Sequence, residues 1–216
     1  MERYRDREHA GYRLAASIAD VAGLLPVDLV LGIPRGGVIV AAPVAEATRA
    51  TLDVAVARKL GAPMQRELAM GAVAPGGPPV LNTSLISRLR VTGAEVEAEL
   101  VRQRAEAHRR ETLYRAGRPP LEIAGRRVVV VDDGVATGAT LVAVIRKVKA
   151  AGAASIIAAV PVGPSQTLRD LVGDADEVVC PLTPAGFRAV GEWYDDFAQV
   201  EDDEVVAALV APHGGA

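Results

Sequence analysis

Two adjacent carboxylates, Asp132 and Asp133, follow four consecutive valines and precede a run of small residues. The valines, residues 128–131, are typical of a strand that is buried on both faces. In open α/β sheets, ligands bind outside the carboxyl ends of the strands. Because the two carboxylates stand where this strand must end, the sequence predicts a binding site there.

The run of small residues after the carboxylates is typical of a phosphate-binding loop. It consists of Gly134, Val135, Ala136, Thr137, Gly138, Ala139 and Thr140, and it leads into a helix expected to start at Thr137 or Gly138. Small side chains allow a ligand to approach the backbone, whose amide groups and helix N-terminus favour an anion. The two threonine hydroxyls add hydrogen-bond donors.

The carboxylates would repel a phosphate, so we expect them to bind something electropositive or hydroxylated beside it. Two ligands meet that requirement: a metal ion, or the 2- and 3-hydroxyls of a ribose. A phosphate next to a diol describes a sugar phosphate. The alternative is purely structural, with Asp132 and Asp133 capping a helix and Thr137 serving as its N-cap.

The apolar pattern around this segment predicts strands that alternate with helices. We expect strands near residues 28–34, 52–61, 125–131, 154–162 and 176–182, and helices near residues 7–25, 38–50, 92–115, 141–148 and 166–172. Residues 62–79, rich in Gly and Pro, are expected to form a mobile loop. This order specifies an α/β fold: an open, mostly parallel sheet with helices on both faces.

The composition narrows the class of protein. The chain has 216 residues, a formal net charge of −3 and 50 % hydrophobic residues, which favours one folded domain, residues 1–216, over disorder. The single cysteine excludes an internal disulfide framework, and the near-neutral charge argues against nucleic-acid binding. No signal peptide or membrane-spanning run is evident, so we expect a cytoplasmic protein that does not bind membranes.

The sequence VVVVDDGVATGAT, residues 128–140, resembles the signature of the type I phosphoribosyltransferases: a hydrophobic strand, two acids, two variable residues and a Thr/Ser-Gly-x-Thr loop. The resemblance implies transfer of a phosphoribosyl group from 5-phosphoribosyl 1-pyrophosphate (PRPP) to a nitrogenous base, such as a purine, with release of pyrophosphate. It implies that Asp132 and Asp133 hold the ribose hydroxyls and that residues 134–140 complete the PRPP site around the 5-phosphate. Residues 67–71 resemble a subgroup of unsettled substrate, which includes members fused to hydrolase domains.

The resemblance also implies a pyrophosphate site at the ends of the first two strands. The loop Arg35-Gly36-Gly37 follows the first strand, and Arg58 and Lys59 end the second. Arg35 and Lys59 are expected to act in catalysis by stabilising the negative charge of the leaving group.

Further roles follow from the same resemblance. The second acid, Asp133, is expected to help deprotonate the incoming base. Mg²⁺ is the implied cofactor; it would be bound through the ligand, with Asp132 and Asp133 as candidate protein ligands. Residues 62–79 occupy the position of the family's flexible catalytic loop, which excludes water when it closes.

The acceptor is left open by the sequence. In this family a variable hood covers the base, and residues 183–216 are expected to form it, with Phe187, Trp193 and Tyr194 as candidates for stacking on the base. Simple packing of Trp193 and Tyr194 against the first helix is the alternative. The helical segment 92–115, part of an insertion over 62–118, could serve as hood, as loop support or as the arm of a homodimer. A PRPP-sensing regulator without turnover is the second functional hypothesis.

Overall fold

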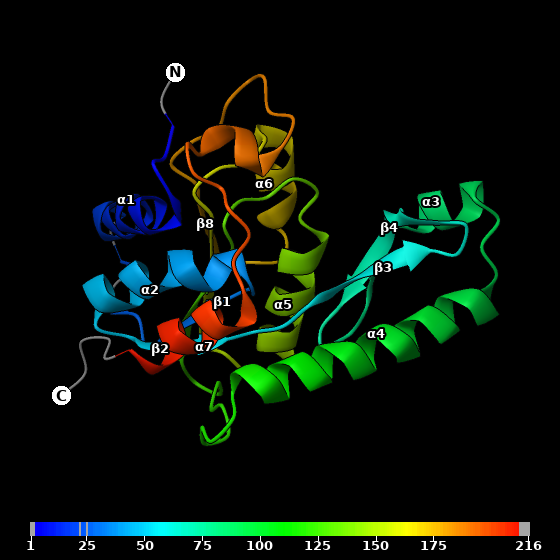
Figure 1. The fold of residues 1–216 in the computed structure, drawn as a ribbon, viewed down its shortest axis with the longest axis horizontal. Coiled ribbons are helices and arrows are strands. Elements are labelled where there is room, and N and C mark those ends of the chain that lie inside the picture. Colours follow the sequence, from blue (N-terminus) through cyan, green and yellow to red (C-terminus); the bar gives the residue numbers. More distant parts are fainter. Residues whose placement is uncertain (1–2, 22, 25, 212–216) are drawn as a thin grey trace.

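Figure 1 shows the computed structural model of the chain, which describes residues 3–21, 23–24 and 26–211. At its centre lies a sheet of five parallel strands in the order β2-β1-β6-β7-β8. From edge to edge these are β2 (Thr51–Val54), β1 (Leu29–Gly32), β6 (Arg127–Val131), β7 (Ser155–Ala159) and β8 (Glu177–Val179). The expected parallel sheet is therefore confirmed.

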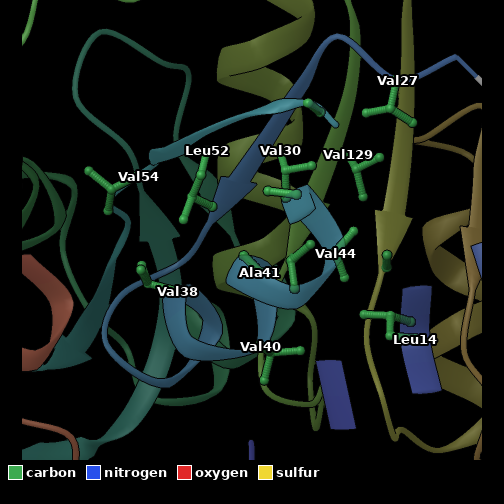
Figure 2. Packing of buried hydrophobic residues seen from close by; sticks show 14 of the residues in the cluster. Leu14, Val27, Val30, Val38, Val40, Ala41, Val44, Leu52, Val54 and Val129 are labelled. Carbon is green, nitrogen blue, oxygen red and sulfur yellow. The ribbon is translucent and has the colours of Figure 1, made fainter. Parts of the chain in front are cut away.

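Helices cover both faces of this sheet, as expected. One face is covered by α1 (Arg7–Asp20), α2 (Gly36–Thr48) and α7 (Asp202–Val210), and the other by α5 (Ala139–Ala150) and α6 (Ser165–Leu171). The four valines of β6 divide between the two cores because side chains alternate along a strand. Val129 and Val131 join the first core, and Val128 and Val130 join the second. Figure 2 shows Val129 beside Val30 in the first core.

The close crossing of α1 and α2 brings the start of α1 to the site. A β-carbon at Gly11 would lie 2.5 Å from the carbonyl oxygen of Val40 and 2.9 Å from the ring of Pro43. Pro43 lies inside α2, which continues through it to Thr48. The absence of a side chain at Gly11 lets the two helices approach each other.

A second module extends from the central sheet (Figure 1), and we call residues 58–114 the arm. Its antiparallel sheet consists of β3 (Arg58–Ala62), β4 (Gln65–Val73) and β5 (Val80–Leu81), and its helices are α3 (Thr83–Arg88) and α4 (Gly93–Tyr114). The arm has its own small core, formed by Leu60, Met70, Val73, Leu85, Val96 and Leu100. The capping box expected at Thr92 and Glu95 begins α4.

The structure corrects the prediction in this region. The single strand expected at 52–61 is two strands, β2 and β3, which belong to different sheets. The loop expected over 62–79 contains the nine-residue strand β4, which buries Met70 and Val73. Gly71 leaves no room for a side chain beside the backbone of Val80, which explains why glycine interrupts the strand pattern.

Part of the remaining chain lies at the carboxyl end of β6, where the hydroxyl of Tyr194 donates to the carbonyl oxygen of Asp133. It includes a 3-10 helix, η1 (Val190–Trp193), between β8 and α7. The first helix ends at Asp20 rather than near residue 25, and residues 22, 25 and 212–216 of the expected elements lie outside the described residues. Among the described residues, no helix is long and apolar enough to cross a membrane.

Candidate active site

The carboxyl end of β6 places the two acids side by side. The amide of Asp133 donates to Oδ1 of Asp132 at 2.9 Å, and the hydroxyl of Tyr194 donates to the carbonyl oxygen of Asp133 at 2.6 Å. Both backbone polar groups of Asp133 are thus satisfied by specific partners. The second acid is fixed by the strand before it and by the C-terminal segment above it.

Arg7, at the first position of α1, forms an ion pair with Asp133. Its Nε donates to Oδ2 of Asp133 at 2.8 Å, and the two side chains are 11 % and 19 % exposed. The same guanidinium donates from Nη1 to the carbonyl oxygen of Ala198 at 2.8 Å and lies 3.8 Å above the ring of Phe197. The sequence gives no sign of this contact, because 126 residues separate Arg7 from Asp133.

Burial raises the pKa of both acids above the ordinary value for aspartate. The pKa of Asp132 is raised by burial and then by the charge of Asp133, and it is lowered by the amide of Asp133, by Lys59 and by Arg7. For Asp133, burial raises the pKa and Arg7 opposes the shift through its charge and its hydrogen bond. Neighbouring carboxylates whose pKa values are raised by burial are typical of functional sites.

The loop after β1 packs directly against both acids. A β-carbon at Gly36 would collide with the carboxylate of Asp133, and one at Gly37 would lie 2.9 Å from the α-carbon of Asp132. The Pro34–Arg35 peptide is cis. The structure therefore brings the predicted pyrophosphate loop and the predicted diol acids together, through glycines that leave space for the carboxylates.

Arg35 reaches a partner that the sequence did not suggest. Its Nη1 lies 3.4 Å from Oε2 of Glu201 and 3.8 Å from Oδ1 of Asp202, at the start of α7. Both carboxylates are more exposed than Arg35 itself, so this pairing is weak in water. Arg35 lies in the loop that was predicted to bind pyrophosphate. Its guanidinium points toward the start of α7.

The predicted phosphate loop ends at a helix with an uncapped N-terminus. Helix α5 begins at Ala139, and its N-cap, Gly138, has a φ of 77° and no side chain to bond the first amides. The loop is fixed from outside, because the hydroxyl of Thr167 donates to the carbonyl oxygen of Ala136 at 2.7 Å. Thr137 is exposed and does not cap the helix, so the purely structural alternative is wrong for this residue. Free amides at a helix N-terminus favour an anion.

A cavity of about 500 Å³ connects this loop to the arm. Lys59 and Thr140 both line it, and the charge of Lys59 acts on Asp132. Arg58 lines the cavity too, but its Nε donates to Oε1 of Gln103 on α4 at 3.2 Å. Both residues begin β3 and do not end the second strand, which corrects the prediction. Within the part of the chain that the structure describes, the Lys59 side chain makes no comparable bond, so it is better placed than Arg58 to face the acids.

Of the aromatic residues proposed for base stacking, Trp193 and Tyr194 lie in the protein interior and Phe187 is partly buried. Trp193 and Tyr194 are 5 % and 2 % exposed, and they pack with Tyr4 in a small core against which Phe187 also packs. The packing alternative is the better description of Trp193 and Tyr194, because their ring faces are covered by protein. The ring of Phe197, which is 36 % exposed, lies beside the site and contacts the guanidinium of Arg7.

The acids retain oxygens suited to a cation that arrives with a ligand. Among the described residues, Oδ2 of Asp132 and Oδ1 of Asp133 receive no hydrogen bond, and no group of three or more His, Cys, Asp or Glu side chains could hold a metal ion. Mg²⁺ commonly binds through one or two carboxylates together with substrate phosphates. The two acids fit that mode of binding.

Residues 5–195 match the family model of the phosphoribosyl transferase domain. The chain belongs to this family. Among relatives of this phosphoribosyl transferase domain, a Mycobacterium tuberculosis protein named "Putative phosphoribosyl transferase" is 46 % identical over 213 residues, which are 99 % of this chain and 48 % of the relative. The chain thus spans about half the length of the curated relatives it matches.

Two further similarities differ in extent. The crystal structure of TT1426 from Thermus thermophilus superimposes with a TM-score of 0.80 at 42 % identity, and the match covers 96 % of this chain and 98 % of that one. An adenine phosphoribosyltransferase of Mycobacteroides abscessus is 46 % identical over 70 residues, which are 32 % of this chain and 36 % of the relative. The first similarity extends to the whole fold, including the arm, whereas the second is confined to about a third of the chain.

Proposed function

We propose that this phosphoribosyl transferase domain transfers a phosphoribosyl group from PRPP to a nitrogenous base and releases pyrophosphate. One geometric observation supports this proposal above the others. The free oxygens of Asp132 and Asp133 lie at the end of β6, a few residues before the uncapped N-terminus of α5. The carboxylate oxygens can accept hydrogen bonds from the two ribose hydroxyls, and the free amides of α5 can bind the 5-phosphate. Together these groups suit a ribose 5-phosphate.

The reaction breaks the bond between ribose C1 and the pyrophosphate oxygen. Positive charge develops on the sugar and negative charge on the leaving group, so the protein contributes mainly by electrostatics and positioning. The carboxylates of Asp132 and Asp133 fix the ribose hydroxyls and stabilise the positive charge. When bound with PRPP, Mg²⁺ neutralises part of the charge on the pyrophosphate.

We assign pyrophosphate binding to two side chains. Lys59 borders the cavity beside the phosphate loop, and Arg35 stands in the loop that contacts the acids. Arg35 must leave its weak contacts with Glu201 and Asp202 to reach the leaving group. This exchange costs little, because ion pairs with exposed carboxylates such as these contribute little in water.

The second acid has a further role in this proposal. Oδ2 of Asp133 is bound by Arg7, and Oδ1 is left to hold a ribose hydroxyl or to receive a proton from the base. Burial raises the pKa of Asp133, which makes its carboxylate a better proton acceptor than an exposed one.

Purines are the first acceptor class to test, because one partial relative is named an adenine phosphoribosyltransferase. The second hypothesis, a PRPP sensor without turnover, gains no support from the family model or the relatives. A cytoplasmic location and a homodimer remain part of the proposal.

Pyrophosphate release measured with PRPP, Mg²⁺ and a panel of purine and pyrimidine bases tests the function. We expect release that depends on one class of base and is lost in Asp133→Asn. Tight PRPP binding with no release on any base would favour the sensor. Failure to bind PRPP at all would overturn both hypotheses.

A further inference from the structure

Arg7 makes three contacts that join segments far apart in the sequence. Its guanidinium bonds the carboxylate of Asp133, bonds the carbonyl oxygen of Ala198 and lies over the ring of Phe197. The side chain is 11 % exposed, so the charge is held almost entirely by these partners. A buried guanidinium is retained only where its donors are well satisfied.

We propose that Arg7 is a positioning residue, which fixes the carboxylate of Asp133 for the ribose diol and connects that carboxylate to the C-terminal segment 196–201. The proposal rests on the proposed function, since it assumes that Asp133 binds the ribose of PRPP. Neither the signature nor the pyrophosphate loop includes Arg7.

The first part of the proposal follows from the space around Asp133. Arg7 holds Oδ2 on one side, and Gly36 lies so close on another that a β-carbon there would collide with both the carboxylate and Nε of Arg7. The carboxylate therefore has little freedom to rotate. Its other oxygen, Oδ1, stays available to a ligand, so the arginine selects which oxygen faces the diol.

The second part follows from the two remaining contacts. Phe197 and Ala198 lie in the segment between η1 and α7, and Tyr194 of the same region bonds the backbone carbonyl of Asp133. Residues 194–198 thus contact both the main chain and, through Arg7, the side chain of the second acid. Displacement of this segment would release the carboxylate from its fixed orientation.

Arg3 provides a matched control on the same N-terminal segment. Its Nη2 donates to the carbonyl oxygen of Tyr194 at 2.8 Å, and its Nη1 lies 3.5 Å from Asp195. It is an arginine that contacts residues just before the segment 196–201 without touching either acid. A role of Arg7 that consists only of attaching the N-terminus would be shared by Arg3.

The test compares two ligands, PRPP and pyrophosphate, by titration calorimetry with Mg²⁺ on Arg7→Met, Arg7→Lys and Arg3→Met. Loss of one partner of a buried charge pair predicts PRPP binding weaker by about ten- to a hundredfold in Arg7→Met. Pyrophosphate, which has no diol, should bind as in the wild type. Arg7→Lys keeps the charge and should recover part of the PRPP affinity, and Arg3→Met should bind both ligands normally.

The following outcomes would overturn either this proposal or the proposed function. Equal weakening of PRPP and pyrophosphate in Arg7→Met, or the same loss in Arg3→Met, would show a merely structural role and overturn the proposal. PRPP affinity unchanged in Arg7→Met would overturn it as well. Wild-type protein that binds no PRPP would instead contradict the proposed function. If thermal denaturation shows that Arg7→Met is unfolded, the affinities for PRPP and pyrophosphate are compared in Arg7→Lys instead.

Discussion

The α-carbon of Gly36 lies against the carboxylate of Asp133, with no room for a side chain between them. The two residues come from different strand ends, β1 and β6, which are adjacent in the central sheet. The contact therefore joins the loop expected to bind pyrophosphate to the acid expected to bind ribose. A ligand that spans both would bind at one continuous surface.

Replacement of Gly36 by alanine should disrupt the site. The added methyl group must displace either the loop or the carboxylate of Asp133, so we expect PRPP affinity to fall by at least about tenfold. Gly93→Ala is a suitable control, because a β-carbon there meets nothing within 4 Å. Calorimetric titration of both variants with PRPP checks this, and wild-type affinity in Gly36→Ala would contradict the packing described.

Asp133→Asn should remove the charge that pairs with Arg7 and that we propose accepts a ribose hydroxyl. The side chain keeps its shape, but Arg7 is left nearly buried without a charged partner. We expect PRPP affinity to fall by about tenfold or more, with a smaller effect on pyrophosphate. Equal affinities of wild type and Asp133→Asn for PRPP would show that the second acid does not bind the ligand.

Thr137→Val tests the phosphate loop with a change of similar volume. The exposed hydroxyl caps nothing in the helix, so its removal should leave stability unchanged. Loss of one donor to a charged phosphate predicts roughly tenfold weaker binding of ribose 5-phosphate. Thermal denaturation and a ribose 5-phosphate titration measure the two quantities separately, and an unchanged titration would place the phosphate elsewhere.

Arg35→Met separates the pyrophosphate site from the sugar site. Because its partners Glu201 and Asp202 are exposed, the substitution should change the free energy of unfolding little. We expect pyrophosphate to bind about tenfold more weakly and ribose 5-phosphate to bind as before. Weaker binding of ribose 5-phosphate, with pyrophosphate binding unchanged, would contradict the assignment of Arg35 to the pyrophosphate site.

Tyr114→Phe tests how the arm is connected to the C-terminal helix. The Tyr114 hydroxyl donates to Oδ1 of Asp202 at 2.6 Å, and burial followed by this carboxylate raises the pKa of Tyr114 to about 12. Because Asp202 is half exposed, we expect a loss of only about 1 kcal/mol, or roughly 2–4 °C in Tm.

The raised pKa of Tyr114 also predicts that the stability of the protein depends on pH. In the unfolded chain Tyr114 loses its proton near its ordinary pKa of 10, whereas in the folded protein it keeps the proton up to about 12. The contribution of Tyr114 to stability is therefore present below pH 10 and is lost as the pH rises toward 12. The difference in Tm between wild type and Tyr114→Phe should shrink over that range. A constant difference would contradict the raised pKa.

The sequence predicted the central sheet, and the position of the candidate phosphate loop at the end of one of its strands, because their signals are local. Four valines specify a strand buried on both sides, and the acids and glycines that follow must stand at its carboxyl end. The long helix of the arm was predicted, but its antiparallel sheet was missed because glycine and alanine in β4 allow close contact with β5 and so obscure the alternation of a strand. Composition rich in Gly and Pro therefore predicted a loop where a strand forms.

The roles of Arg7 and Phe197 could not be predicted from local pattern. In the sequence, Arg7 is one of several charged residues in the N-terminal segment. The packing of α1 against α2 in the folded chain brings it to Asp133. The burial of Trp193 likewise depends on Tyr4, which lies nearly two hundred residues away in the sequence. Contacts of this kind arise from tertiary packing alone.

A crystal structure of the protein with PRPP and Mg²⁺ would test the central claim most directly. We predict the 5-phosphate at the amides that begin α5, with the ribose hydroxyls within hydrogen-bond distance of Oδ2 of Asp132 and Oδ1 of Asp133. A phosphate bound away from residues 136–140, or a ribose that touches neither acid, would contradict the account.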